Sequence, residues 1–79
     1  MNIVIFVKYK VNKATNEDYY EARSPISKKA VTMSHDLHFT GLENHRHAAR
    51  YYAECHGYKI MREVYAAKQG TAWLAEKPW

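Results

Sequence analysis

"TGLENHRHAARYYAECHG", residues 40–57, carries a helix signal at each end. Thr40 and Glu43 match the capping box T-x-x-E, in which a hydroxyl and a carboxylate each accept a hydrogen bond from a backbone amide at the helix start. Gly57 stands where helices commonly end in a left-handed residue. Because apolar positions recur at helical spacing between these signals, we predict one helix bounded by Thr40 and Gly57.

The predicted helix has two dissimilar sides. One stripe is largely apolar or aromatic and consists of Leu42, His45, Ala49, Tyr52, Ala53 and His56. The opposite stripe is polar and consists of Glu43, Arg46, His47, Arg50 and Glu54. Such a helix buries its apolar stripe against another layer and turns its charged stripe to solvent. We therefore expect Arg46 and Arg50 on the outer surface of the molecule.

Two strands are predicted at the start of the chain. Residues 2–11, NIVIFVKYKV, are rich in β-branched and aromatic side chains, which favour a strand. Residues 12–18 form a polar, turn-prone stretch, and the alternation that follows predicts a short second strand at about 18–23.

Residues 24–39 fit two structures. Ser24 before Pro25 is typical of a helix start, and some apolar positions keep helical spacing. Apolar or aromatic side chains also alternate strictly with polar ones from Val31 to Phe39. Because this alternation gives more matches than the helical spacing, we predict a third strand at about 29–39.

Two further strands are predicted after the helix. Residues 58–67 and 71–77 are apolar segments joined by a short loop that contains a glycine, which is typical of a β-hairpin. The element order is then β-β-β-α-β-β within a single domain, residues 1–79. This order predicts an α+β fold, an antiparallel sheet of four to five strands with one helix packed on one face.

Composition limits the compartment and the partners. The chain has 79 residues, a formal net charge of +4 and one cysteine. A single cysteine cannot form a disulfide framework and fits a reducing compartment. The apolar run at the start is too short to span a bilayer and lacks the features of a signal peptide. We therefore expect a cytoplasmic protein without membrane contact, whose positive charge permits an anionic partner.

All five histidines and Cys55 lie within residues 35–57, yet their spacing does not suit a reaction centre. On a helix, His45 and His47 point to nearly opposite sides, and His47 and Cys55 lie roughly 12 Å apart. Asp36 and His38 could share a face of a strand, but two ligands alone do not make a metal site. The chain also lacks a phosphate-binding glycine loop. We expect no catalytic residues, no metal and no cofactor.

Basic and aromatic residues on the strands predict a binding surface instead. A sheet covered by one helix leaves its other face for solvent or for a partner. We assign to this face Lys8, Lys10, Tyr20, Arg23, Lys59 and Arg62. Arg46 and Arg50 would form a second, smaller basic patch on the helix. Such residues suit stacking on bases, phosphate contacts or an acidic protein surface. Equally, the face could be merely solvated, with lysines protecting the sheet edges.

The last third of the chain carries a family resemblance. The features that carry it are His56-Gly57, Met61-Arg62, Gly70, Trp73-Leu74-Ala75, Lys77 and Trp79. This stretch resembles the tail of small phage-encoded anti-CRISPR proteins that inhibit the type I-F surveillance complex. The resemblance implies a non-catalytic inhibitor that occupies the nucleic-acid-binding surface of a host CRISPR complex by protein–protein contact. Residues 34–47 have no counterpart in that family, and no contact residues are carried over.

A second resemblance concerns DNA-binding domains made of three strands and a helix, as at integrase N-termini. Residues 35–52 would supply the last strand and the helix there, and the sheet would enter the major groove. The two additional strands after the helix argue against this assignment. We thus expect a phage-type inhibitor, monomeric or homodimeric, acting in the host cytoplasm, with a small DNA- or RNA-binding module as the alternative.

Overall fold

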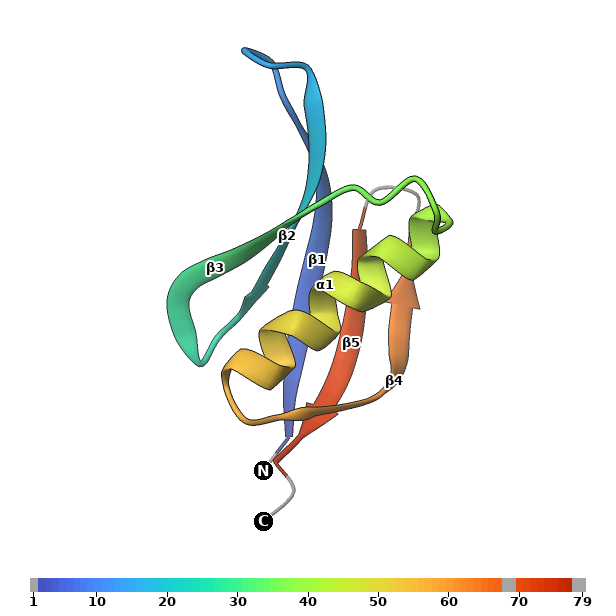
Figure 1. Ribbon diagram of the computed structural model, residues 1–79. Helices are drawn as coiled ribbons and strands as arrows, with labels where there is room; N and C mark the ends of the chain where they lie inside the picture. Colours follow the sequence, from blue (N-terminus) through green and yellow to red (C-terminus); the bar gives the residue numbers. More distant parts are fainter. Residues whose placement is uncertain (1, 68–69, 78–79) are drawn as a thin grey trace.

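The computed structural model describes residues 2–67 and 70–77. The elements follow in the order β1 (Asn2–Asn12), β2 (Glu17–Ser24), β3 (Ser27–Ser34), α1 (Gly41–Cys55), β4 (Lys59–Ala66) and β5 (Gly70–Glu76). The strands form one sheet in the order β3-β2-β1-β5-β4, and every neighbouring pair is antiparallel. The helix lies across one face of this sheet (Figure 1). The α+β class and the order of elements expected from the sequence are confirmed.

Strand β1 occupies the middle of the sheet because both of its sides are paired. Ile3, Ile5 and Val7 alternate toward the helix and are buried. The intervening residues point to the open face, where Phe6 is 48% exposed. The apolar start of the chain therefore builds the core with every second side chain.

Helix α1 begins and ends where its signals predict. The Glu43 amide donates to the Thr40 hydroxyl over 3.2 Å, and the Thr40 amide donates to the Glu43 carboxylate over 3.1 Å. At the other end Gly57 adopts a positive φ of 76°, which glycine reaches without steric cost. The buried side consists of Asn44, His45, Ala48, Ala49, Tyr52 and Ala53. Its three alanines let the helix lie close to the sheet.

Strand β3 differs from the predicted one. It covers Ser27–Ser34 rather than residues 29–39, and the chain then turns through residues 35–39 to the helix. Two sets of hydrogen bonds stabilise this turn: the Asp36 carboxylate accepts the His38 amide over 2.8 Å in an Asx turn, and the Asn44 side chain on α1 bonds the loop backbone. The alternation that suggested a longer strand is coincidental here, because Leu37 is 89% exposed.

The β1–β2 hairpin projects beyond the rest of the sheet (Figure 1). The β1–β5 ladder stops at the pair Lys8–Gly70, whereas the β1–β2 ladder continues to Asn12–Glu17. The far edge strand β4 is interrupted by two register shifts, between Ile60 and Arg62 and between Glu63 and Tyr65. Bulges of this kind discourage edge-to-edge pairing between sheets.

Candidate binding groove between the helix and strand β4

On the open sheet face, an acidic side chain stands among the basic residues that the sequence predicted there. Lys8, Lys10 and Arg23 do lie on this face. Glu21 stands among them and accepts hydrogen bonds from Lys10 over 3.1 Å and from Arg23 over 2.7 Å. The Arg23 guanidinium, and then Lys10, lower the pKa of Glu21, which keeps its carboxylate charged. Two of the three cations are therefore partly neutralised.

Tyr20 does not belong to the predicted surface. Its side chain points to the helix-covered face and is 2% exposed. It lies edge-on to the His45 ring, with the ring centres 4.8 Å apart. The physical reason is strand alternation, which puts Tyr20 on the same face as the buried Ala22. A partner on the open face cannot reach this tyrosine.

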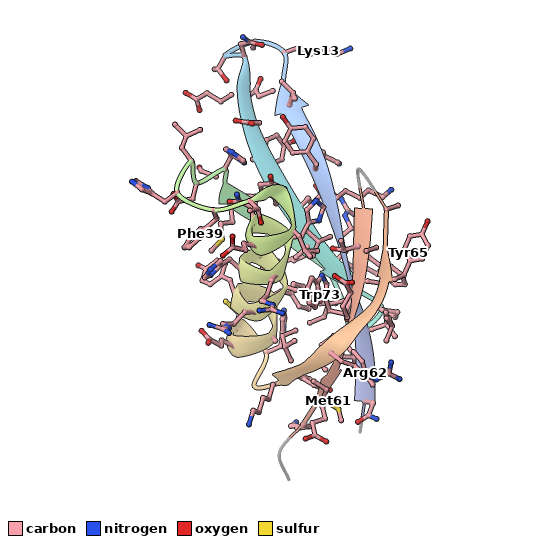
Figure 2. All side chains as sticks on the ribbon, turned by 90° about the vertical axis from the view of Figure 1, so that its right-hand side faces the viewer. Lys13, Phe39, Met61, Arg62, Tyr65 and Trp73 are labelled. Atoms are coloured by element: carbon pink, nitrogen blue, oxygen red, sulfur yellow. The ribbon has the colours of Figure 1, made fainter. Side chains whose placement is uncertain are left out.

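Four of the predicted residues border a single groove of about 420 Å³ between α1 and β4. Arg46 and Arg50 approach it from the helix, and Lys59 and Arg62 belong to the facing strand. Both arginines of α1 are exposed, as the helical stripe predicted, and they border this groove. Figure 2 shows the Arg62 side chain turned toward the open side of the sheet, away from the helix. Arg46 and Arg50 approach the groove from the helix, and Lys59, which pairs with Glu76 in the β4–β5 ladder, borders it at the start of β4.

Aromatic and apolar side chains form the remaining walls. Trp73 lies between the helix and the sheet (Figure 2) and is 2% exposed. The Arg46 guanidinium carbon stands 5.8 Å from the centre of the Trp73 ring, which is within cation–π range. Ile60 and the half-exposed Met61 add apolar surface. The sequence did not predict that these apolar side chains line a groove together with the arginines. That arrangement depends on how β4 packs beside α1.

The groove is positively charged. Its lining includes two carboxylates, Glu54 and Glu63, beside the basic side chains. Within residues 2–67 and 70–77, no ion pair joins an acidic group to Arg46, Arg50 or Lys59. Cations that lack a partner inside the protein are available to an anionic group outside it. The arrangement suits binding of phosphate or carboxylate groups.

A buried polar network supports the floor of the groove. The Trp73 indole donates to the Thr71 hydroxyl over 2.8 Å, and Nδ1 of His45 lies 3.0 Å from the same oxygen. If the Thr71 hydroxyl donates its own proton to Nδ1, all three groups are satisfied with a neutral imidazole. Burial lowers the pKa of His45, against a smaller opposite effect from Glu63. The histidine is therefore a structural, uncharged residue at neutral pH.

This network predicts a pH dependence of stability. The pKa of His45 lies below its ordinary value of 6.5 in the folded state, so the unfolded chain binds more protons as the pH falls past that value. The contribution is complete above about pH 6.5 and is lost as the pH decreases toward the folded-state pKa. Urea unfolding of the native chain should therefore lose more free energy between pH 7.5 and pH 5 than unfolding of His45→Gln. The control His47→Gln should keep the native slope; parallel curves for the native chain and His45→Gln would refute this assignment.

The other histidines make separate contacts. His47 stacks on Phe39 with ring centres 4.3 Å apart, and Nδ1 of His38 lies 3.0 Å from the Asp36 carboxylate. Nδ1 of His35 lies 2.9 Å from the Tyr20 hydroxyl. Among the residues that the structure describes, no three His, Cys, Asp or Glu side chains come together in a way that could hold a metal ion.

The helix described here, Gly41–Cys55, does not have the length and apolar character that a membrane span requires. No protein-family model, no curated protein and no solved structure matches this chain. The groove itself is therefore the basis on which a function is assigned.

Proposed function

We propose that this protein is a non-enzymatic binding protein of the anti-CRISPR kind, which inhibits a nucleic-acid-handling complex through the groove between α1 and β4. The observation that carries the proposal is that Arg46, Arg50 and Lys59 border one groove and form no ion pair with any residue in the described part of the chain. These cations adjoin exposed apolar surface at Met61. Arginine beside apolar surface is a combination enriched in the centres of protein interfaces.

The resemblance to anti-CRISPR proteins supports the same surface. The stretch that carries it, residues 56–79, includes β4 and β5. Strand β4 forms one wall of the groove, and Trp73 on β5 lies at its base. Of the residues behind the resemblance, Met61, Arg62 and Trp73 are among those that line the groove.

The sign of the charge specifies what the groove contacts. A chain of net charge +4 is repelled by the basic channel with which a surveillance complex holds nucleic acid. Electrostatic complementarity favours an anionic part of the target, either an acidic protein surface or the phosphates of its bound nucleic acid. Inhibition would then follow from covering the region around the nucleic-acid path.

Direct DNA or RNA binding is the second candidate. The observation in its favour is that Arg46, Arg50 and Lys59 border the same groove, an arrangement that suits phosphates of one backbone. Electrophoretic mobility shifts with duplex and single-stranded DNA and with RNA, at about 50 mM salt and upward, separate the candidates. A direct binder should shift nucleic acid at low salt and release it steeply as salt rises; absence of any shift removes this candidate.

The double variant Arg46→Gln/Arg50→Gln tests the groove. Because each lost charge-assisted contact contributes about 1.5–3 kcal/mol, we expect at least tenfold weaker binding to purified type I-F surveillance complex, measured by biolayer interferometry. The matched control is Lys28→Gln/Lys29→Gln, which removes the same charge from exposed positions near the start of β3. Unchanged binding by the groove variant would exclude this surface, and no binding by the native chain would exclude the target.

A further inference from the structure

A second cavity, of about 620 Å³, lies where the β1–β2 hairpin projects past β5. It shares no lining residue with the groove between α1 and β4. The hairpin contributes Tyr9, Asp18 and Tyr20, and the opposite side consists of His35, Gly41, Leu42, His45, Ala66, Ala67 and Thr71. Three separate parts of the chain therefore meet around one cavity.

The aromatic walls are held in place by hydrogen bonds and ring contacts. The Tyr9 hydroxyl donates to Oδ2 of Asp18 over 3.0 Å. The Tyr9 and Tyr20 ring centres are 5.4 Å apart and tilted by 54°. His35 stacks on Tyr20 at 5.8 Å and shares a hydrogen bond with its hydroxyl. The cavity is thus built from ordered side chains before any ligand arrives.

The cavity lining carries a negatively charged side chain, whereas the whole chain has a net positive charge. Among the residues that the structure describes, Asp18 is the only Asp, Glu, Lys or Arg in the cavity lining, in a chain of net charge +4. The Asp18 side chain is 40% exposed, and within the described residues its Oδ1 atom accepts no hydrogen bond. Hydrogen bonding to Asp18 raises the pKa of Tyr9, and burial raises that of Tyr20, so both phenols stay neutral at physiological pH. One free carboxylate oxygen beside aromatic rings remains for a ligand.

We propose that this cavity binds a guanidinium group, with Asp18 as the counter-ion and Tyr9 as its aromatic wall. A guanidinium carries five N–H donors in one plane, so it can bond a carboxylate while it stacks on an aromatic face. Its charge also gains from the ring quadrupoles through cation–π attraction. The Tyr9 hydroxyl, whose proton is already donated to Asp18, keeps lone pairs that accept a further N–H. The group can come from a free small molecule or from an arginine on another protein.

The test uses the full chain and two ligands that differ in charge alone. N-acetyl-arginine amide is titrated into the protein, and the NMR signals of the imidazole C–H protons of His35 and His45 are followed. N-acetyl-citrulline amide is the uncharged control ligand. We expect saturable shifts at both histidines with the arginine ligand and at least tenfold weaker binding of the citrulline ligand. An arm with the peptide Gly-Gly-Arg-Gly-Gly shows whether an arginine within a polypeptide also enters. Equal binding of the charged and neutral ligands, or no shift with any arginine ligand, overturns the proposal.

Two variants locate the binding on the structure. Asp18→Asn removes the charge but keeps an oxygen that can accept the Tyr9 hydroxyl, and it should weaken arginine binding about tenfold or more. Glu17→Gln removes the same charge from the neighbouring exposed residue and should stay within twofold of the native chain. If Asp18→Asn proves unfolded by circular dichroism, Tyr9→Phe supplies the second measurement, because it removes the phenol oxygen and should weaken binding. Native affinity in a folded Asp18→Asn or Tyr9→Phe chain contradicts the assignment.

Discussion

Replacement of Trp73 by alanine should lower the free energy of unfolding by about 3–5 kcal/mol, the usual cost of removing a buried tryptophan. Trp73 is the largest of the fully buried side chains and belongs to the core cluster together with Ile5, Val7 and Tyr52. The substitution opens a cavity between the helix and the sheet and leaves the Thr71 hydroxyl without its donor. A domain of this size has a total stability of roughly 4–12 kcal/mol, so the loss would be a large share of it.

Urea unfolding followed by far-UV circular dichroism measures this loss without depending on tryptophan fluorescence. Trp73→Phe is the matched variant, because it retains an aromatic ring while it removes the indole N–H and part of the volume. It should cost about 1–3 kcal/mol, clearly less than alanine. A Trp73→Ala chain within about 1 kcal/mol of the native stability would show that this side chain is not central to the core.

The groove depends on the same residue. Since Arg46 lies over the Trp73 ring, loss of the ring removes the surface that orients this guanidinium. Trp73→Phe should therefore preserve most of the binding to a partner, whereas Trp73→Ala affects binding and folding together. Stability and binding are coupled because one side chain belongs both to the core and to the base of the groove.

The sequence predicted the elements whose signals are local. The capping box of Thr40 and Glu43 determines the start of the helix within its own first turn, and the glycine at position 57 determines its end. The five strands appeared for the same reason, because alternation and turn residues act over a few neighbours. These signals do not depend on the packing of distant segments.

The candidate site was predicted only in part, because its geometry depends on packing. Arg46 and Arg50 were recognised as non-core residues, but only the placement of β4 beside the helix turns them into one wall of a groove. The face of Tyr20 depended on which side of β2 the helix covers, and the strand pattern left that open. Nothing in the spacing indicated that Asp18 would meet His35, since the two come together only through the pairing of β2 with β3.

The loop before the helix shows a different limit. Alternation through residues 35–39 predicted a strand, whereas four hydrogen bonds from one distant side chain impose a turn. That side chain is Asn44, on the first turns of α1 and 2% exposed. Its carbonyl accepts the Asp36 amide over 2.8 Å, and its amide donates to the Asp36 and Thr40 carbonyls, each over 3.0 Å. A further bond reaches the Phe39 carbonyl at 3.4 Å.

Asn44→Ala should consequently cost about 2–4 kcal/mol, because it leaves several backbone groups of the loop without their partners. Urea unfolding measures the cost, and amide hydrogen exchange at Asp36 should accelerate before global unfolding. Asn44→Asp separates the two halves of the interaction, since it keeps the acceptor for the Asp36 amide but places a second oxygen against carbonyls. The control His38→Ala removes an exposed side chain of the same loop and should change stability by less than about 0.5 kcal/mol. If Asn44→Ala changed the free energy of unfolding as little as His38→Ala, the Asx turn at Asp36 would be enough to hold the loop. The helix would then not determine where β3 ends.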